Sequence, residues 1–506
     1  MIQGAGDGIS LLAILLVWPL LVAMALVPLR GARIIQRVAL IGTLIELGLS
    51  LWIFVDFAAA PTAAFRFEEQ LPWIDAIGAS IHIGIDGLSA PFLPLTALLT
   101  VIAAAQTRTT VSHRQKPYLI SVLTFSTATT GVFTALDLGL FFVFWELMLI
   151  PTFVLIKLWG TGPGRSHAAT KYVLAMLMGS MTLLAAFVLL SVNHRTVTGS
   201  LSFDYLALLE VEVPAGLETV LFFLMAFSFT LKAPLFPMHS WLPPALQEGP
   251  IGIGILLAGL KVGVYGFLRL IMPLTPGAFM QWKWLIAVLA VLAILYGGLA
   301  ALAQPDLRRL IAFAGVSHVG LALLGLSSGN VDGVSGAVFL LANLGLTAPG
   351  LILVAGFIHQ RLGTTDLGAL GGLAARAPAL TAFALVFVFA EAALPGTSGF
   401  PGEFLAMLGA FREFGAPSLI ALAIVVLSAG YSLIWLQRAF YGPVTRDPVN
   451  HIADLVSHEA SLALAIAAAI VLLGVFPSII LDPAQPSVAQ LVERLETAAD
   501  GLAARR

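Results

Sequence analysis

Residues 229–250 read Phe-Thr-Leu-Lys-Ala-Pro-Leu-Phe-Pro-Met-His-Ser-Trp-Leu-Pro-Pro-Ala-Leu-Gln-Glu-Gly-Pro. The stretch starts inside an apolar run, places Lys232 there, and is then interrupted by Pro234 and Pro237 before His239. Prolines free backbone carbonyl groups, which then need water or protein partners. A lysine at membrane depth costs roughly 2.5–3.5 kcal/mol and normally faces a polar interior. The stretch therefore predicts a broken transmembrane helix whose lysine lines an ion or proton path, rather than one that snorkels to the surface.

The composition places the whole chain in a membrane. Hydrophobic residues occupy 59% of the 506 positions and charged residues only 10%, which excludes a soluble globule. The net charge of −2 favours neither nucleic acid nor an acidic surface as a partner. No cysteine is present, which excludes thiolate iron–sulfur ligation, disulfides and cysteine catalysis. We expect an all-α polytopic membrane protein.

Each helical crossing of a bilayer needs about 20 apolar residues. On that criterion the sequence predicts fourteen spans, near residues 9–29, 36–58, 85–105, 118–136, 138–159, 169–192, 217–237, 250–273, 283–303, 307–327, 333–358, 379–408, 417–440 and 459–481. No basic residue precedes the first of these, and no small-residue cleavage pattern follows it. We therefore interpret it as a retained span and not as a signal peptide.

The basic residues predict the orientation of these spans. Most lysines and arginines fall at one set of alternating span ends, so the positive-inside rule places both termini on the outer side. Lys232 and Lys261 are the two that we place well inside spans. The outer loop 59–84 is expected to be ordered, because it carries prolines and a tryptophan. The residues after Pro486 are expected to form a short amphipathic helix that contacts a surface or a partner.

The interruptions predict an internal repeat. The seventh span breaks at residues 232–237, and the twelfth breaks five spans later at residues 394–403. Interrupted helices in corresponding positions indicate inverted repeats with a site at the midplane. We therefore divide the chain into N-terminal transmembrane helices (1–110), a first five-helix repeat (118–273), a second, inverted repeat (281–440), and a last transmembrane helix with its tail (457–506).

Glu146 is a carboxylate in an apolar helix, in the sequence Phe-Trp-Glu-Leu-Met. It could form a structural ion pair with a neighbouring helix. It could also tune Lys232, because a nearby negative charge favours the charged form of a lysine while burial disfavours it. We favour tuning, since ionisable residues inside a membrane are usually functional.

Three further residues suit proton transfer. Lys261 stands among small residues that allow close helix approach and leave room for water. His318, on the tenth span, is suited to a proton relay because histidine titrates near neutrality, although a lone histidine on an apolar helix is more often a satisfied core residue. Glu403 follows the second break. No metal-ligand spacing, phosphate-binding loop or dinucleotide fingerprint accompanies them.

These motifs resemble the antiporter-like membrane subunits of respiratory NADH:quinone oxidoreductase (complex I), and among them subunit M. The resemblance covers nearly the whole chain. It is carried by Gly84-Ile-Asp-Gly-Leu-Ser89, Trp145-Glu146, Ala168-Ala-Thr-Lys171, Lys232-Ala-Pro with His239-Ser-Trp-Leu-Pro243, Leu260-Lys261, Asp306-Leu-Arg-Arg-Leu-Ile-Ala312 with Ser317-His-Val-Gly320, and Leu394-Pro-Gly-Thr-Ser-Gly-Phe-Pro-Gly-Glu-Phe404.

The resemblance implies a proton-translocating subunit with fourteen helices in two inverted five-helix repeats. It implies a proton path through Glu146 paired with Lys232, then Lys261, His318 and Glu403, in which glutamate at the last position is typical of subunit M. The expected partners are the L-type and N-type membrane subunits in a bacterial inner membrane. NAD, FMN, iron–sulfur clusters and quinone are expected in partner subunits, and none in this chain.

The chain departs from the family pattern at three points. Leu246 stands where the family commonly has a histidine after the seventh helix, and Leu344 stands in an Asn-Leu-Gly run where Asn-His-Gly is usual. Glu391 is an added carboxylate. We expect Asn343 with water, or Glu391, to replace the missing group between His318 and Glu403, which requires Glu391 to face the interior. The alternative is that Glu391 forms a structural clamp with an arginine, Arg376 or Arg412.

Two other functions fit the same residues. One is a subunit of a multi-subunit sodium/proton antiporter, which shares the Lys232 and Glu146 motifs. The other is a scaffold subunit of an ion-coupled hydrogenase or a carbon dioxide–hydrating complex. The soluble subunits that co-purify with the chain would separate these alternatives.

Overall fold

The computed structural model describes residues 10–444 and 447–504. The N-terminal part comprises α1 (Leu11–Leu26), α2 (Ala32–Ala59), β1 (Arg66–Ile74), β2 (Ala79–Ile85) and α3 (Phe92–Thr110). The middle part comprises α4 (Gln115–Thr134), α5 (Leu138–Leu147), α6 (Leu149–Trp159), α7 (Arg165–Thr198), α8 (Tyr205–Leu209), α9 (Ala215–Lys232), α10 (Leu242–Glu248), α11 (Ile251–Gly259), α12 (Val262–Gly266) and α13 (Met272–Leu274). The last part comprises α14 (Pro276–Leu302), α15 (Leu307–Ser327), α16 (Val331–Leu362), α17 (Pro378–Glu391), α18 (Gly399–Phe414), α19 (Ala423–Phe440), α20 (Asp447–Asn450), α21 (Ser457–Val475) and α22 (Ser478–Ala504).

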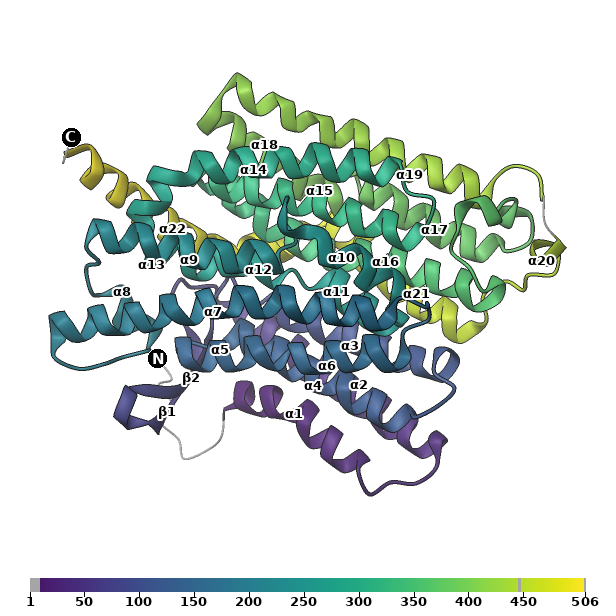
Figure 1. The fold of residues 1–506 in the computed structure, drawn as a ribbon, viewed down its shortest axis with the longest axis horizontal. Coiled ribbons are helices and arrows are strands. Elements are labelled where there is room, and N and C mark those ends of the chain that lie inside the picture. Colours follow the sequence, from purple (N-terminus) through teal and green to yellow (C-terminus); the bar gives the residue numbers. More distant parts are fainter. Residues whose placement is uncertain (1–9, 445–446, 505–506) are drawn as a thin grey trace.

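These helices form an elongated bundle in which most long helices run along the long axis (Figure 1). Ten helices in the described part of the chain are long and apolar enough to cross a membrane, and α1 and α17 are shorter apolar helices. The β-hairpin and α8 lie at the left end of the bundle in Figure 1, where α22 also ends, and α20 lies at the right end. The prediction of a multi-span helical membrane protein is confirmed.

The core lies in the middle of the bundle. The most apolar segments of α15 and α16 are 100% buried within the chain, and that of Ile251–Leu274 is 94% buried, whereas the other candidate spans are only 33–44% buried. The burial of α15 depends on close helix packing. A Cβ at Gly297 of α14 would lie 2.6 Å from the backbone nitrogen of Ser317 on α15. Polar residues on the buried helices are therefore shielded from lipid by the other helices.

Both predicted helix breaks are confirmed, and the structure adds a third. The chain leaves helical geometry after α9 and again between α17 and α18. The predicted span 250–273 is also interrupted, at Leu260 and Lys261, between α11 and α12. No proline marks this break, which is why the sequence predicts a continuous helix there.

The outer loop is ordered, as predicted, but it is a β-hairpin rather than irregular structure. Strands β1 and β2 pair antiparallel, so the prediction of an entirely helical chain is wrong at this place. The predicted span 85–105 is also wrong at its start, because α3 begins only at Phe92. Asp86 explains why the helix starts later than predicted. Its carboxylate accepts hydrogen bonds from the backbone nitrogens of Leu88 and Ser89 at 3.1 and 3.2 Å, and these bonds stabilise a turn before the helix.

The C-terminal helix is longer than predicted. Helix α22 begins at Ser478 and continues through Pro483 and Pro486, whereas the sequence predicts a helix only after Pro486. The hydroxyl of Ser487 accepts a hydrogen bond from the backbone nitrogen of Gly87 at 3.1 Å, between two segments 400 residues apart in the sequence. This contact, like the burial of Leu491 and Leu495, depends on tertiary packing and leaves no local sign in the sequence.

The orientation prediction rests in part on residues that lie outside the described ones. These are the chain start at residues 1–9 and the basic residues Arg446, Arg505 and Arg506. The end of the bundle that carries the hairpin and the end of α22 is the one that the basic-residue pattern assigns to the outer side.

The hairpin is fastened to the bundle by His82 of β2, which is 2% exposed. The imidazole contacts the carboxylate of Asp204 on one side and lies 3.0 Å from Glu68 Oε1 on the other. Burial alone would lower the pKa of His82, but Asp204 and Glu68 outweigh burial and raise the pKa above 6.5. Burial would raise the pKa of Asp204, but its bond to His82 outweighs burial and lowers it.

These shifts predict that the hairpin opens more easily at alkaline pH. A histidine with a raised pKa contributes stability that is complete below its unfolded value of about 6.5 and is lost as the pH rises through its folded value. The Asp204 contribution is present above its unfolded value, about 3.9, and is lost only in acid. Hydrogen exchange of residues 79–85, corrected for the intrinsic pH dependence, should therefore be slowest near pH 5–6 and accelerate towards pH 9. The His82→Gln variant should lose this acceleration, and equal pH profiles in both proteins would contradict the assignment.

Candidate functional site

The break after α9 presents Lys232 at a helix end. The last regular contact joins the backbone nitrogen of Ala233 to the carbonyl of Phe229 at 2.7 Å, and Pro234 and Pro237 prevent the helix from continuing. The indole of Trp241 donates to the carbonyl of Leu231 at 2.8 Å. Protein groups therefore satisfy part of the freed backbone.

Lys232 is held by Trp145 of α5. Its ammonium group donates to the carbonyl oxygen of Trp145 at 3.1 Å and lies 3.9 Å from the centre of the indole ring. Both contacts favour a cation, since an aromatic face attracts positive charge. Trp145 thus acts directly on the lysine.

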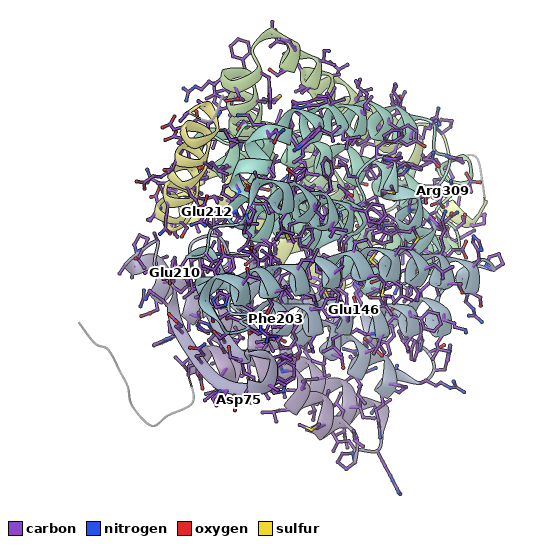
Figure 2. The ribbon with its side chains drawn as sticks, turned by 60° about the vertical axis from the view of Figure 1, so that its left-hand side comes forward. Asp75, Glu146, Phe203, Glu210, Glu212 and Arg309 are labelled. Carbon is purple, nitrogen blue, oxygen red and sulfur yellow. The ribbon has the colours of Figure 1, made fainter. Side chains whose placement is uncertain are left out.

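Glu146 does not form the expected direct pair with Lys232. Its carboxylate accepts a hydrogen bond from the hydroxyl of Ser180 on α7, and no ion pair within 4.0 Å joins it to Lys232 in the part of the chain that the structure describes. Lys232 nevertheless lies near Glu146, because its ammonium group contacts Trp145, the residue directly before Glu146. Figure 2 shows Glu146 between the end that carries Asp75, Glu210 and Glu212 and the end that carries Arg309.

Lys261 occupies the break between α11 and α12 and is 6% exposed. A small internal cavity is lined by both Lys232 and Lys261, together with Phe125, Tyr172 and Leu260. The cavity offers about 20 Å³ to the centres of water molecules, and one water requires roughly 10–15 Å³ on that measure. One water molecule therefore fits in the cavity that Lys232 and Lys261 both line.

Lys261 also reaches α15. A Cβ placed on Gly315 would lie 3.7 Å from the ammonium nitrogen of Lys261. His318 follows three residues later and thus lies one turn along on the same face of α15. The break at Lys261 therefore connects the lysine cavity with the helix that carries the histidine.

His318 is fully buried and lies between two carboxylates. Its Nε2 is 3.1 Å from Glu403 Oε1, and its Nδ1 is 3.4 Å from Glu391 Oε1. Nδ1 is also 3.0 Å from the carbonyl oxygen of Ala314. Both ring nitrogens thus face acceptors, an arrangement that suits the doubly protonated ring, in which both nitrogens donate.

Glu391 and Glu403 are 2% and 1% exposed, and one oxygen of each, Oε2, is buried without a hydrogen-bond partner among the described residues. The prediction that Glu391 faces the interior near the second break is confirmed. The alternative arginine clamp is wrong, because Arg412 contacts Asp332 and Arg376 contacts Asn450 at 3.3 Å.

The remaining predicted residues lie around this array. Asn343 is buried on α16, and its Oδ1 accepts a hydrogen bond from the hydroxyl of Ser398 at 2.6 Å. His239 packs among aromatic rings, 4.9 Å from the ring centre of Tyr296, and does not join the carboxylates and lysines. Leu246 and Leu344 are 2% and 0% exposed and fill the apolar core.

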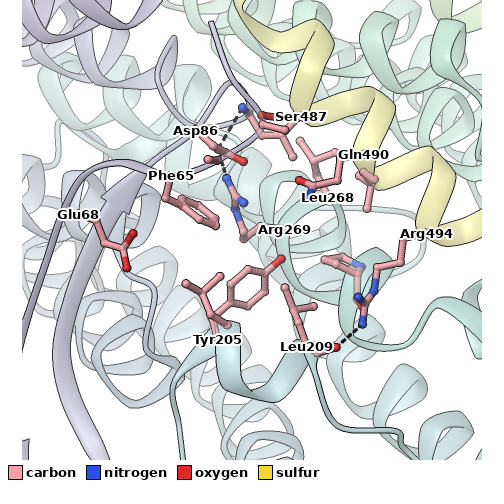
Figure 3. Close-up of a pocket in the computed structure, with 16 residues that line it drawn as sticks. Phe65, Glu68, Asp86, Tyr205, Leu209, Leu268, Arg269, Ser487, Gln490 and Arg494 are labelled. Carbon is pink, nitrogen blue, oxygen red and sulfur yellow. Dashed lines mark hydrogen bonds and ion pairs between the residues drawn. The ribbon is translucent and has the colours of Figure 1, made fainter. Parts of the chain in front are cut away.

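A separate pocket of about 400 Å³ opens beside the hairpin (Figure 3). Arg269 points into it between Asp86 and Tyr205, and Arg494 of α22 lines its far side. Asp86 and Arg269 form a buried ion pair, and Arg494 donates to the carbonyls of Pro273 and Leu209 at 2.8 and 2.9 Å. The pocket therefore joins the hairpin, α13 and α22 and lies apart from the lysine and histidine array.

Comparison with known proteins identifies the family of the chain. Residues 135–430 match the family model described as NADH:quinone oxidoreductase/Mrp antiporter, TM. The chain belongs to this family. The resemblance to subunit M is also confirmed: the family member named NADH-quinone oxidoreductase subunit M in Pseudomonas aeruginosa is 36% identical over 92% of this chain and 94% of that protein. The one in Escherichia coli K12 is 33% identical over 91% and 93%.

Solved structures of the family have the same fold. A chain of the respiratory complex I from Thermus thermophilus with bound NADH is 34% identical, covers 96% of this chain and 99% of its own length, and has a TM-score of 0.88. A chain of the Mrp complex from Dietzia sp. DQ12-45-1b has a TM-score of 0.83 at 22% identity. The second match concerns the fold alone.

The structure adds residues that the sequence reasoning missed. The hydroxyl of Tyr431 on α19 donates to Glu391 Oε1 at 3.4 Å and lies 3.4 Å from His318 Nδ1. Ser180 binds Glu146. A sign was present for Tyr431, because it shares a helical face with Ser428, Ser432 and Trp435, an unusual polar stripe in an apolar helix.

Proposed function

We propose that this chain is the M-type proton-translocating subunit of a bacterial NADH:quinone oxidoreductase. It assembles with L-type and N-type membrane subunits in the inner membrane, with both termini outside. The fourteen crossings form two inverted five-helix repeats. NAD, FMN, iron–sulfur clusters and quinone belong to partner subunits, and this chain transfers protons and no electrons.

The observation that carries this proposal is the placement of His318 between Glu391 and Glu403. A fully buried imidazole with a carboxylate on each side can take a proton on one nitrogen and release it from the other. The ammonium group of Lys261 lies beside Gly315, one turn before His318 on α15, and Glu403 follows the break before α18. The protonatable groups thus follow one another from Lys232 to Glu403 through the most deeply buried helices.

Electrostatic coupling explains how partner subunits drive this path. A charge that appears near Glu146 acts on Lys232, since Lys232 contacts Trp145, the residue next to Glu146. The small cavity then offers water for transfer towards Lys261. From there the proton reaches His318 and Glu403, with Tyr431 hydrogen-bonded to Glu391.

Replacing Glu146 by glutamine tests this coupling. The amide keeps the shape and the contact with Ser180 but removes the charge, so we expect at least a fivefold lower proton-to-electron ratio in a complex that still assembles. The measurement is proton uptake by proteoliposomes during NADH oxidation. Ser180→Ala, which removes the partner and keeps the charge, serves as the control and should lose much less. An unchanged ratio in Glu146→Gln would contradict the proposal.

A sodium/proton antiporter subunit is the second candidate, favoured by the similarity of the fold to the Mrp chain. The two functions differ in their partners. Peripheral NADH-binding and iron–sulfur subunits that co-purify with the chain support the first function, and a purely membrane complex with sodium-dependent proton movement supports the second.

A further inference from the structure

A buried carboxylate on α2 lies outside the array described above. Glu46 is 1% exposed, although it belongs to a helix whose neighbouring residues Leu44 and Ile45 are exposed at the surface of the chain. Its Oε1 accepts a hydrogen bond from the hydroxyl of Ser126 on α4 at 2.6 Å. Its Oε2 is buried and has no hydrogen-bond partner among the described residues. A carboxylate in this position needs an explanation.

Within residues 10–444 and 447–504, no cation forms an ion pair within 4.0 Å with Glu46. Helix α2 packs against α1, α3, α4 and α22. Helix α1 carries no charged residue. Arg108 of α3 lies roughly 12 Å along its helix from Thr100, and Lys116 of α4 roughly 15 Å along its helix from Ser126. On α22, Arg494 donates to Pro273 and Leu209 instead.

On α2 itself the other charged groups are also distant. Arg37 lies roughly 13 Å along the helix from Glu46, and Asp56 pairs with Arg66 at 2.6 Å. The acidic residues of α22 add no positive charge. An ionised carboxylate with one accepted hydrogen bond and no cation is too costly in such surroundings, and such a group becomes neutral instead.

Ser126 connects Glu46 with α3. The hydroxyl of Thr100 lies 2.9 Å from the hydroxyl oxygen of Ser126 and 2.8 Å from the carbonyl oxygen of Thr96. Because a hydroxyl has one proton and two lone pairs, Thr100 donates to one of these acceptors at a time. The two hydroxyls therefore form a short chain, from α2 through α4 to α3, whose hydrogen bonds can reverse.

The far end of this chain adjoins the Lys261 break. Leu99, next to Thr100, packs so closely on α11 that a Cβ on Gly259 would lie 2.5 Å from its Cδ1. Gly259 is the last residue of α11, directly before Leu260 and Lys261. The hydroxyl chain therefore ends on α3, the helix that also packs against the end of α11 next to the Lys261 break.

We propose that Glu46 is a second proton-binding site, a neutral carboxylic acid that exchanges its proton through Ser126. The ligand is a proton rather than a metal cation. Sodium in a protein needs several oxygen ligands, and among the residues that the structure describes only the Ser126 hydroxyl lies within hydrogen-bonding distance of the Glu46 carboxylate. The site does not use Glu146 and is independent of whether the chain pumps.

Infrared spectroscopy of the assembled complex in membranes tests whether Glu46 is protonated and whether its proton exchanges through Ser126. The spectrum should contain a carboxylic-acid C=O band at neutral pH that is absent from Glu46→Gln and that shifts on transfer to D₂O. In Ser126→Ala the rate of this shift should fall at least tenfold. In the matched variant Ser126→Thr, which keeps the hydroxyl, it should stay within twofold of the wild type.

Three other results would each contradict one part of the proposal: that Glu46 is protonated, that its ligand is a proton, or that Ser126 is the exchange route. Identical carboxylic-acid bands in wild type and Glu46→Gln would show that Glu46 is ionised. Removal of the band by sodium chloride, but not by choline chloride, would make the site a sodium site. Equal shift rates in the alanine and threonine variants would exclude Ser126 as the route.

If the variants fail to assemble, the proposal can still be tested on the wild-type protein. Dicyclohexylcarbodiimide reacts with protonated acids: the carboxyl oxygen bonds to the carbodiimide carbon, the proton passes to nitrogen, and the adduct rearranges to a stable acylurea. Mass spectrometry at pH 7 should find at least tenfold more adduct on Glu46 than on Asp75 and Glu210, two acidic side chains that are exposed to solvent. Equal labelling of the three would overturn the proposal.

Discussion

Arginine at position 232 is expected to lower proton translocation at least tenfold while the complex still assembles. Arginine keeps its charge permanently, whereas a buried lysine releases and regains its proton readily. The lysine ammonium contacts the Trp145 carbonyl and ring, so a cation there still has favourable partners. Loss of pumping in this variant would therefore reflect loss of proton exchange and not loss of positive charge.

A matched control is available on α6. Lys157 also lies over an aromatic ring, 5.0 Å from the centre of Phe153, but at a helix end away from the array. Lys157→Arg should pump normally. Lys232→Ala should assemble less well than Lys232→Arg, because it leaves the Trp145 carbonyl without its donor. Near-normal pumping by Lys232→Arg, measured in proteoliposomes, would show that a fixed charge is sufficient and that Lys232 carries no proton.

Alanine at position 391 is expected to reduce coupled turnover at least tenfold. Glu391 supplies one of the two carboxylates beside His318 and accepts the hydrogen bond of Tyr431. Its removal leaves the Nδ1 side of the imidazole with the Ala314 carbonyl and the Tyr431 hydroxyl. The imidazole then keeps only the Glu403 carboxylate as an acidic neighbour among the described residues, so the proton path loses one of its two acceptors beside His318.

The control for Glu391 lies on the same helix. Phe389 is 37% exposed at the surface of the chain, so Phe389→Ala should cost less than twofold in NADH-driven proton pumping. Tyr431→Phe keeps both carboxylates and should fall between the two. Full pumping by Glu391→Ala would remove Glu391 from the path and leave Glu403 as the only carboxylate that serves His318.

The sequence by itself determined the class of the protein, two of its helix breaks and most of its candidate site. Apolar content over 506 residues is a property of composition, so it needs no tertiary information. Proline breaks a helix through its own ring and missing donor, so the interruption after Lys232 is local. A lysine, histidine or glutamate inside an apolar span is conspicuous for the same reason.

Tertiary structure alone decided which groups meet. The family resemblance implied a pair of Glu146 and Lys232, but in the folded chain Glu146 accepts a hydrogen bond from Ser180 and Lys232 donates one to Trp145. The tertiary structure also brings the Tyr431 hydroxyl to Glu391, to which it donates a hydrogen bond. Hydrogen-bond partners in this chain lie on helices far apart in the sequence, and helix periodicity fixes the face of a residue but not the neighbour that covers it.

The same limit applies to backbone geometry without a local signal. The break at Lys261 has no proline, and Gly263 allows α12 to approach so closely that a Cβ there would lie 2.3 Å from the backbone nitrogen of Ala233. The prolines of α22 stay inside a helix that packs on Gly87. In both places packing between distant segments outweighs local preference, because the free energy of burial and hydrogen bonding exceeds the small differences between local conformations.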